Sequence, residues 1–382
     1  MSHTENILGM LSSTIDQRND LMVTPPWVAK DMVNLLPEEV WNKNTTFLDP
    51  ACKSGIFLHE IYLKLMETEN LIKEFPDKTE RRQHILNNQL FGIALNPMCQ
   101  LTTARTVYGT IKGENNIKLI DNYITIVKNK DGRFLKEALE KEFNREMKFD
   151  VVIGNPPYQE ESGGRNAKPL YNDFVRNMYD ICSISCFITP SRWVTGGIGL
   201  DSFREWMLSL DCIQYIRDFR NATKIFNGVI ISGGVMYYLI NKSYHGKCNI
   251  EYTDDFGNKT TYNRLINQYS IYIRDNNAVK IVDKVDKTNT LDTIMSSLNP
   301  FGIDADMRGY SEPTNIKKYR LLSSGGYGYI SEYEIEKGTE YLPYYKTIVA
   351  KALSSKPGKI LGTTSVLEPN EVCTFSYFVN AP

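Results

Sequence analysis

The stretch Phe149–Tyr158 constrains the fold of this chain more than any other part of the sequence. Its centre is apolar (Val151, Val152 and Ile153) and is followed at once by Gly154 and then by a pair of prolines. An apolar run bounded by glycine and proline is typical of a strand inside a parallel sheet. Each proline fixes its own φ and favours an extended conformation in the residue before it. The stretch therefore predicts a buried strand that ends in a stiff turn.

The turn after this strand carries polar and aromatic groups that suit one kind of chemistry. Because prolines have no N–H, the carbonyls of Asn155 and Pro156 can point outward beside the Asn155 amide. An exocyclic amine is a poor nucleophile, and two acceptors could orient its hydrogens and aim its lone pair at a methyl donor. Tyr158 adds a flat face on which a planar ring can stack. We therefore predict Asn155, Pro156, Pro157 and Tyr158 as catalytic residues, and a proline turn that only packs is the alternative.

The tetrapeptide Asn155–Tyr158 resembles motif IV of the S-adenosylmethionine-dependent N6-adenine DNA methyltransferases. Enzymes of that family methylate N6 of an adenine, and a base in a duplex could reach such a turn only by flipping out of the helix. Similar tetrapeptides also occur in methyltransferases that act on ribosomal RNA or on protein glutamine. The resemblance therefore needs support from the rest of the chain.

A second turn resembles motif I of the same family, which usually reads Asp-Pro-Ala-Cys-Gly-Ser-Gly-x-Phe-Leu. Residues 49–58 match this pattern at every fixed position except Lys53, where the family commonly has glycine. We hypothesise that Lys53 pairs with the methionine carboxylate of the donor or with a DNA phosphate, and a solvated lysine on a turn is the alternative. The resemblance implies a donor site that includes Asp49, Ala51, Lys53, Ser54, Gly55 and Phe57.

A segment nearer the N-terminus resembles motif X, which lies against the methyl donor and precedes motif I in the gamma order. It begins at Thr24 and Pro25, both of which we include in the donor site. Thr24 can cap a helix whose first turn tolerates proline. We expect Trp27 to belong to the apolar face of this helix, together with Val28, Met32 and Val33.

The second strand of the expected sheet gives a weaker prediction of which residues contact the methyl donor. An acidic residue at the end of such a strand ordinarily holds the ribose hydroxyls of a nucleoside cofactor. The family has it two residues after a glycine, and that position is Ala94 here. Asn96 could supply one hydrogen bond instead. Asp121 is the candidate for motif III near the adenine of the donor, with an ordinary loop aspartate as the alternative.

Three residues are predicted to contact the target base or the DNA. Tyr238 lies in the expected strand Val229–Leu239, which resembles motif VIII, and a core tyrosine is the alternative. Arg192 follows the strand of a segment that resembles motif VI. Arg165 lies in the glycine-rich and charged loop Gln159–Lys168, which could order on DNA.

Composition and charge limit the remaining possibilities. The net charge is −1, so a DNA-binding surface must be a local patch. The seven cysteines form no Cys-x-x-Cys pair and there are only four histidines, so we expect no metal site. We find no signal peptide and no apolar run of membrane-spanning length, and we therefore expect a cytoplasmic protein with no membrane partner.

The order of strands and helices predicts an α/β fold with a doubly wound, mostly parallel sheet, that of a class I S-adenosylmethionine-dependent methyltransferase, over residues 1–287. Residues 288–382 change to short segments rich in tyrosine, and they resemble the target-recognition region of restriction-modification methylases. We expect a smaller mixed α/β domain there. Family members usually continue beyond this point, so the domain would be truncated.

Together these motifs resemble a gamma-class, TaqI-like methylase of type II restriction-modification systems. The resemblance implies S-adenosylmethionine as methyl donor and double-stranded DNA as partner, with any restriction endonuclease on another chain. Two alternatives stay open. One is a DNA-binding subunit whose donor site has decayed, because Lys53 and Ala94 depart from the motifs. The other is a methyltransferase that acts on RNA or protein.

Overall fold

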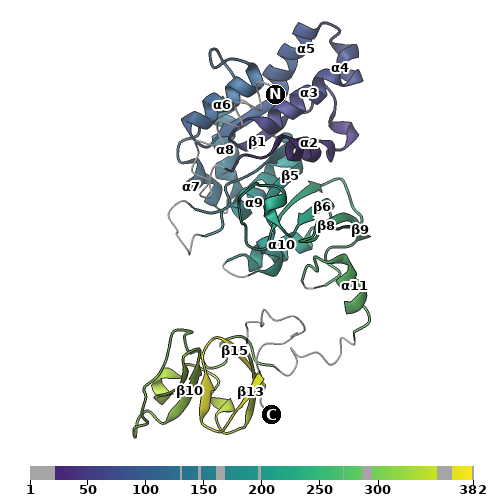
Figure 1. Cartoon of the computed structure of the whole chain (residues 1–382). Helices are drawn as coiled ribbons and strands as arrows, with labels where there is room; N and C mark the ends of the chain where they lie inside the picture. Colours follow the sequence, from purple (N-terminus) through teal and green to yellow (C-terminus); the bar gives the residue numbers. More distant parts are fainter. Residues whose placement is uncertain are drawn as a thin grey trace. The chain divides into compact units, whose positions relative to one another are not determined.

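The computed structural model describes residues 22–129, 131–144, 148–160, 168–196, 199–269, 271–285, 295–350 and 364–380. The chain divides into two compact units, Met1–Val282 and Asp283–Pro382. Figure 1 shows the first unit with its sheet and helices and the second with strands and short helical turns. The boundary expected from sequence, between residues 287 and 288, lies five residues after the division at residues 282 and 283.

The first unit is built on one nine-stranded sheet in the order β3-β2-β1-β4-β5-β7-β6-β8-β9. Its strands are β1 Phe47–Cys52, β2 Leu90–Ala94, β3 Ile117–Lys118, β4 Phe149–Gly154, β5 Cys182–Pro190, β6 Ile213–Phe219, β7 Val235–Asn241, β8 Cys248–Thr253 and β9 Lys259–Arg264. β3, β2, β1, β4 and β5 are parallel, whereas β7 runs antiparallel between β5 and β6. The expected doubly wound, mostly parallel sheet is confirmed.

Helices connect the parallel strands and cover the sheet (Figure 1). They are α2 Pro26–Asn34, α3 Ile56–Glu67, α4 Glu69–Glu74, α5 Lys78–His84, α6 Pro97–Tyr108, α7 Tyr123–Lys128, α8 Gly132–Phe143, α9 Tyr171–Ile181, α10 Asp201–Ser209 and α11 Asn276–Val282. α2 and α6 pack against α3, while α7 and α8 pack against α9. Connections that run outward from β1 and from β4 in opposite directions place these two groups on opposite faces of the sheet.

The register of the central strands brings the two predicted turns together. β4 contains the apolar run of the sequence, and all three of its apolar residues are fully buried, as expected for a strand covered on both faces. Phe47 of β1 pairs with Val151 of β4, and Leu48 pairs with Val152. Because the two strands are parallel neighbours, the turn that follows Asp49 and the turn that begins at Asn155 lie side by side at the carboxyl edge of the sheet.

One expected strand is wrong in part. β7 begins at Val235 rather than at Val229, and residues 229–234 form the end of a loop. Gly233 and Gly234 both have positive φ, +87° and +86°. That backbone conformation does not continue a strand, so the apolar residues before it leave the sheet.

The second unit contains two small sheets around a core of its own. One has the order β11-β10-β14 and the other β13-β12-β15. The strands are β10 Tyr319–Ser323, β11 Gly326–Ile330, β12 Lys346–Ala350, β13 Thr364–Leu367, β14 Glu371–Cys373 and β15 Tyr377–Asn380. Its described residues also form short 3-10 turns, but the α-helical part expected for this unit is not found among them.

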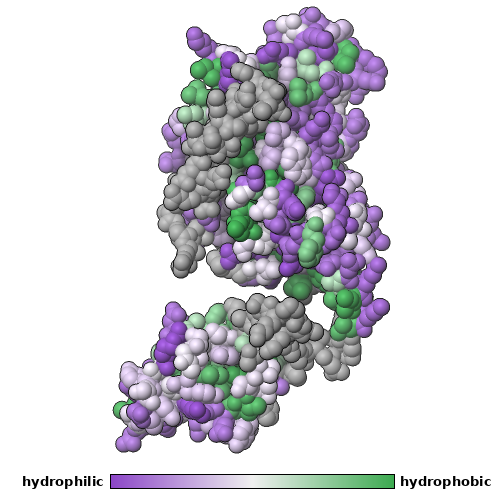
Figure 2. All heavy atoms as spheres, in the orientation of Figure 1, coloured by the Kyte–Doolittle hydropathy of each residue, from purple (hydrophilic) through white to green (hydrophobic). Residues whose placement is uncertain are grey.

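Two further observations concern the surface and the side-chain composition of the described residues. Hydrophilic residues cover most of the described surface of the first unit in the view of Figure 2. Over the described ranges, we find no helix long and apolar enough to cross a membrane. Nor do the side chains of the described part bring together three or more residues that could hold a metal ion.

Candidate active site

The Asn155 side chain is held by its amide nitrogen and leaves its oxygen unused. Asn155 lies directly after β4 and is buried. Its Nδ2 donates to the Met22 carbonyl at 3.3 Å and to Thr24 Oγ1 at 3.1 Å. Its Oδ1 is buried and has no hydrogen-bond partner. A buried acceptor without a partner is costly, so this oxygen is suited to receive a donor from a ligand.

The expected helix cap at Thr24 is wrong. α2 begins at Pro26 with Pro25 in the cap position, and no side chain caps it. Thr24 is buried, and its hydroxyl accepts the Asn155 amide instead of a helix N–H. The expected apolar face is also narrower than predicted, because Trp27 is 51% exposed while Val28 is buried.

The turn after β1 is packed tightly against α3 and α6. Asp49 Oδ1 accepts the backbone N–H of Ala51 at 3.0 Å. Gly55 has φ +78° and precedes α3, and a Cβ added there would lie 3.0 Å from Thr103 Cα. Gly154 is equally constrained, since its added Cβ would lie 2.9 Å from Asp49 Oδ1. Gly154 therefore allows the turns of β1 and β4 to approach each other, and Gly55 allows the β1 turn to approach α6.

The Asp49 carboxyl is the most strongly perturbed acid of this turn. Burial raises its pKa from 3.8 to about 7, against the opposing effects of the Ala51 N–H, the Cys52 thiol and the positive charge of Lys53. A carboxyl with a pKa near neutrality in a cleft is typical of a functional site. Asp49 is therefore ready to ionise when a cation is placed beside it.

Lys53 points into the protein, so the solvated lysine considered as an alternative is wrong. The residue is only 9% exposed. Its Nζ donates to the Met22 carbonyl at 3.3 Å, the same carbonyl that accepts the Asn155 amide. Its charge also acts on Asp49. The residue that departs from the family pattern thus lies inside the predicted donor site.

A small hollow joins the two turns. Thr24, Asp49, Ala51, Lys53, Ser54, Gly55, Ile56, Phe57 and Asn155 line it. Its volume is about 10 Å³, at the lower limit for a single water molecule. The residue types fit S-adenosylmethionine, because Asp49 can pair with an ammonium and Lys53 with a carboxylate. Entry of such a molecule requires movement of Lys53 and of the segment at Met22.

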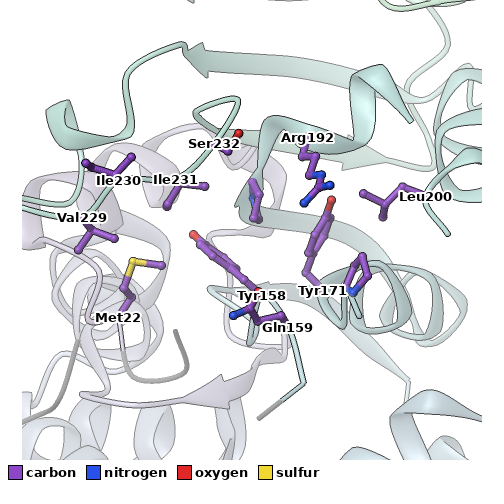
Figure 3. Close-up of a pocket in the computed structure, with 12 residues that line it drawn as sticks. Met22, Tyr158, Gln159, Tyr171, Arg192, Leu200, Val229, Ile230, Ile231 and Ser232 are labelled. Carbon is purple, nitrogen blue, oxygen red and sulfur yellow. The ribbon is translucent and has the colours of Figure 1, made fainter. Parts of the chain in front are cut away.

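A second, larger pocket is lined in part by Met22. Its volume is about 210 Å³. Met22, Tyr158, Gln159, Pro169, Tyr171, Pro190, Arg192, Leu200, Val229, Ile230, Ile231 and Ser232 line it. In Figure 3, Tyr158 lies between Tyr171 and the Val229–Ser232 segment, and the side chain of Met22 lies near its hydroxyl. Aromatic, apolar and polar side chains share this lining, and the rings of Tyr158 and Tyr171 suit a flat heterocyclic ring.

The four predicted catalytic residues are consecutive in the chain, but they face different cavities: Asn155 lines the small hollow and Tyr158 lines the larger pocket. Pro156, Pro157 and Tyr158 are buried and continue directly from Asn155. The Tyr158 and Tyr171 rings meet edge to face with centroids 6.4 Å apart. The Tyr158 hydroxyl is buried without a hydrogen-bond partner. Burial raises the pKa of Tyr158 well above its ordinary value, so this hydroxyl stays protonated.

Of the three residues predicted to contact the target base or the DNA, only Arg192 is found at the larger pocket among the described residues. Arg192 is exposed in the 3-10 turn η4, Ser191–Thr195, and its guanidinium points towards the Tyr171 hydroxyl (Figure 3). Tyr238 of β7 is fully buried, with its hydroxyl 3.5 Å from Thr189 Oγ1, and it does not line the pocket. Arg165 lies outside the described residues.

Asn96 and Asp121, the two further residues predicted to contact the methyl donor, do not line the small hollow. Asn96 caps α6, and its Oδ1 accepts the N–H of Cys99 at 2.9 Å. Asp121 is exposed in the turn before α7. Neither residue lines the hollow, and both remain predictions as donor contacts. Ala94 is buried at the end of β2.

Sequence reasoning missed several residues that shape the site. Met22 supplies the carbonyl shared by Asn155 and Lys53, and Tyr171 forms one wall of the larger pocket. Asp218 at the end of β6 is fully buried and paired with Arg274 at 2.5 Å. β6 contains other polar residues, Gln214 and Arg217, so an acidic residue there did not indicate a buried pair.

Comparison with protein families gives a match over residues 88–226, to the Eco57I restriction-modification methylase family. A protein of Mycoplasma pneumoniae described as an uncharacterized adenine-specific methylase is 27% identical, and the match covers 60% of this chain and 69% of that protein. The chain is thus similar to adenine-specific and restriction-modification methylases. These matches do not distinguish the gamma-class subtype.

Solved structures with a similar fold include a restriction-modification enzyme and a complex with DNA. A nuclease-deletion mutant of the Type ISP enzyme LlaGI, in complex with a DNA substrate mimic, has a TM-score of 0.59 at 11% identity, covering 99% of this chain and 43% of that one. A DrdV–DNA complex has a TM-score of 0.56 at 15% identity, covering 94% of this chain and 49% of that one. The chain spans less than half the length of these two structures, and the likeness shows the fold.

Proposed function

We propose that this chain is a DNA methyltransferase that transfers a methyl group from S-adenosylmethionine to N6 of an adenine flipped out of a duplex. The observation that carries this proposal is the Asn155 Oδ1, a buried acceptor without a partner on a residue that lines the hollow at Asp49 and lies three positions before Tyr158 of the larger pocket. The sequence match to an adenine-specific methylase supports it.

Tyr158 and Tyr171 of the larger pocket would hold the base. Tyr158 stacks on its ring, while Asn155 Oδ1 accepts a hydrogen bond from its amino group and orients the nitrogen lone pair. Among the described residues, no acidic side chain lines the larger pocket. The reaction needs no base before the methyl group has moved, because the adenine nitrogen loses its proton more readily once it is alkylated. S-adenosylmethionine, when bound, supplies an activated methyl group. The work of this chain is therefore positioning.

The donor would be held by residues of the β1 turn. Asp49 and Lys53 match its ammonium and its carboxylate, and Thr24 fixes Asn155 beside them. Ser54, Gly55 and Phe57 complete the wall on the side of α3. We keep Asn96 and Asp121 as outer contacts that a bound donor would have to reach.

Double-stranded DNA is the proposed partner. An adenine paired in a helix could reach Asn155, which faces inward, only after the base is extruded from the duplex. We further propose that the second unit recognises the target sequence, and that a restriction endonuclease acts beside this chain in a restriction-modification system. Of the solved structures named above, LlaGI is a restriction-modification enzyme with a DNA substrate mimic and DrdV is in complex with DNA, which supports this assignment.

A second candidate is a DNA-binding subunit that has lost methyl transfer. The specific observation in its favour is the hollow of about 10 Å³ that Lys53 fills. Isothermal titration of S-adenosylmethionine into the full chain, with and without DNA, separates the candidates. The proposed enzyme binds the donor in at least one condition, whereas a decayed subunit binds it in neither.

Transfer of a labelled methyl group tests the reaction itself. S-adenosylmethionine with a tritiated methyl group is incubated with the full chain and, separately, with plasmid DNA from a methylation-deficient host, with total RNA and with a protein extract. We expect label in the DNA, recovered as N6-methyladenine after digestion. Label confined to RNA or to protein would contradict the proposal and identify the other class of methyltransferase.

A further inference from the structure

The mouth of the larger pocket carries an apolar loop tip that the proposed chemistry does not use. Residues 228–234 connect the 3-10 turn η5, Ala222–Lys224, and the residues after it to β7. Ile230 at the tip of this loop is 89% exposed, while Val229 and Ile231 on either side are half-buried and line the pocket. Figure 3 shows these three side chains on the opposite side of the pocket from Tyr171.

The loop is anchored on the side of η5. Phe226 is buried, and its N–H donates to the Ala222 carbonyl at 2.8 Å. The N–H of Val229 then donates to the Phe226 carbonyl at 3.1 Å. The chain therefore leaves the core at a fixed point immediately before the apolar tip.

The loop is anchored equally firmly on the side of β7. The Gly234 carbonyl accepts the N–H of Ser191 at 3.0 Å, and the Gly234 N–H donates to the Ile231 carbonyl at 2.9 Å. A Cβ added to Gly234 would lie 2.2 Å from the Phe219 carbonyl oxygen, so the loop end packs directly on β6. Only glycine fits this approach at φ +86°.

A buried ion pair locks this second anchor in place. Asp218 accepts Ser191 Oγ at 2.8 Å and Arg274 Nε at 2.6 Å. Arg274 also donates to the Gly233 carbonyl through Nη1. The carboxylate thus ties the loop to the ends of β5 and β6. This network fixes the loop end that follows the tip, and Ile230 is exposed shortly before it.

An isoleucine held in water beside a base-sized pocket needs an apolar partner. The base stack of DNA is such a partner, since proteins that kink or open a duplex often insert isoleucine, leucine or phenylalanine between base steps. The exposed cation of Arg192 lies on the rim of the same pocket and complements a phosphate backbone. The loop tip and this cation therefore present the two kinds of group that a duplex contacts.

We propose that Ile230 is a wedge that enters the duplex and fills the space left by the extruded adenine. This proposal rests on the proposed function and deepens it, because it assigns a residue to extrusion rather than to methyl transfer. Val229 and Ile231 support the wedge from the side of the pocket that receives the base. The wedge lowers the free energy of the open duplex by replacing the lost stacking with apolar contact.

The test compares a paired target with one that is already easy to extrude. Sequencing of modified bases in plasmid DNA methylated by the wild type first identifies the target site. Methylation rates are then measured on short duplexes in which the target adenine faces thymine or an abasic position. We expect Ile230→Ser to slow methylation of the paired duplex by roughly tenfold or more and to leave the abasic duplex within about threefold of wild type.

Two further variants give the controls. Ile230→Leu should behave as wild type, because it keeps an apolar wedge. Ile281→Ser, at an isoleucine of α11 that is 65% exposed, should change neither rate. A 2-aminopurine placed at the target position provides a readout separate from activity, since its fluorescence rises when it leaves the stack. That rise should be reduced in Ile230→Ser and kept in Ile281→Ser.

The outcomes are distinguishable. Equal rates for wild type and Ile230→Ser on the paired duplex would overturn the wedge while leaving the methyltransferase intact. An equal loss on paired and abasic duplexes would also overturn it, since that result places Ile230 in binding rather than extrusion. A wild-type chain that methylates no DNA would overturn the proposed function and the wedge together.

Discussion

Two cavities lie at the turn that contains Asn155 and Tyr158, and they differ in volume and lining. We call the cavity at Tyr158 the base side and the cavity at Asp49 the donor side. The base side is an open pocket of about 210 Å³ walled by Tyr158 and Tyr171. The donor side is a hollow of about 10 Å³ into which Lys53 projects. The first has aromatic, apolar and polar residues in its lining, and the second contains a buried acid and a buried cation. In the proposed reaction, the base would therefore enter a cavity that is already open, whereas the donor would need the small hollow to widen.

This difference has a structural cause. The base pocket is framed by the ends of β4, β5 and β7, which the sheet and the pair of Asp218 and Arg274 hold in place. The donor hollow is closed by the short segment at Met22 and Thr24, which precedes α2 and contacts Asn155 through two hydrogen bonds. A segment held by a few contacts moves more easily than strand ends in the middle of a sheet.

The largest effect should come from the ion pair that frames the base side. Arg274→Ala leaves Asp218 as a buried charge without its partner, and we expect the free energy of unfolding to fall by about 3–5 kcal/mol. Urea denaturation of wild type and variant measures this change. The control is Arg220→Ala, which removes an exposed pair with Asp255 and should cost about 1 kcal/mol or less. Equal losses would show that the buried pair has no special role.

Tyr158 tests whether the base side works through stacking. Tyr158→Ala should lower kcat/KM for DNA methylation by roughly 5- to 150-fold, which corresponds to about 1–3 kcal/mol of base–aromatic stacking. Tyr158→Phe keeps the ring and loses only a hydroxyl that has no hydrogen-bond partner, so its rate should stay within about threefold of wild type. A large loss in Tyr158→Phe would assign the hydroxyl a direct part in the reaction.

Lys53 tests the donor side. If its ammonium pairs with the donor carboxylate, Lys53→Met should weaken binding of S-adenosylmethionine by roughly tenfold to thirtyfold, measured by isothermal titration. The exposed Lys30 gives a matched control, and Lys30→Met should leave the affinity unchanged. Tighter binding in Lys53→Gly would contradict the pairing and show that the side chain only fills the hollow.

The last prediction concerns Asp49 and pH. The pKa of Asp49 is about 7 in the folded chain, above the value near 4 of a carboxyl in the unfolded chain. Ionisation of Asp49 therefore destabilises the folded chain when no donor is bound. Stability should therefore fall as the pH rises from about 4 through 7, and Asp49→Asn should remove that slope. Donor affinity should instead rise between pH 6 and pH 8, by up to about tenfold, because only the ionised carboxyl pairs with an ammonium. A donor affinity independent of pH would contradict this role.

The sequence was sufficient where structure follows from local pattern. The apolar run before Asn155 and the turn at Asp49 were placed correctly, and strand parallelism then brought them together. Arg192 was also placed correctly at the end of its strand, where it reaches the pocket. These features depend on residues within one strand or turn, and the pattern of apolar residues and glycines contains that information.

Features that depend on distant partners could not be predicted. Thr24 caps no helix because its hydroxyl is used by Asn155, 131 positions along the chain. The burial of Lys53 depends on the Met22 carbonyl, and the burial of Asp218 depends on Arg274. The strand expected from Val229 failed because two glycines at positive φ turn the apolar residues out of the sheet. Apolar periodicity alone does not identify a partner or the sign of φ.

The most direct test of the central claim is sequencing of N6-methyladenine in the DNA of a methylation-deficient host that expresses the chain. The account predicts methylated adenines at one defined sequence with the wild type, their loss with Asn155→Ala, and their retention with Asn277→Ala, which alters an exposed asparagine. Far-ultraviolet circular dichroism confirms that each variant is folded. The same methylation pattern in wild type and Asn155→Ala would contradict the claim that the Asn155 oxygen holds the reacting amine.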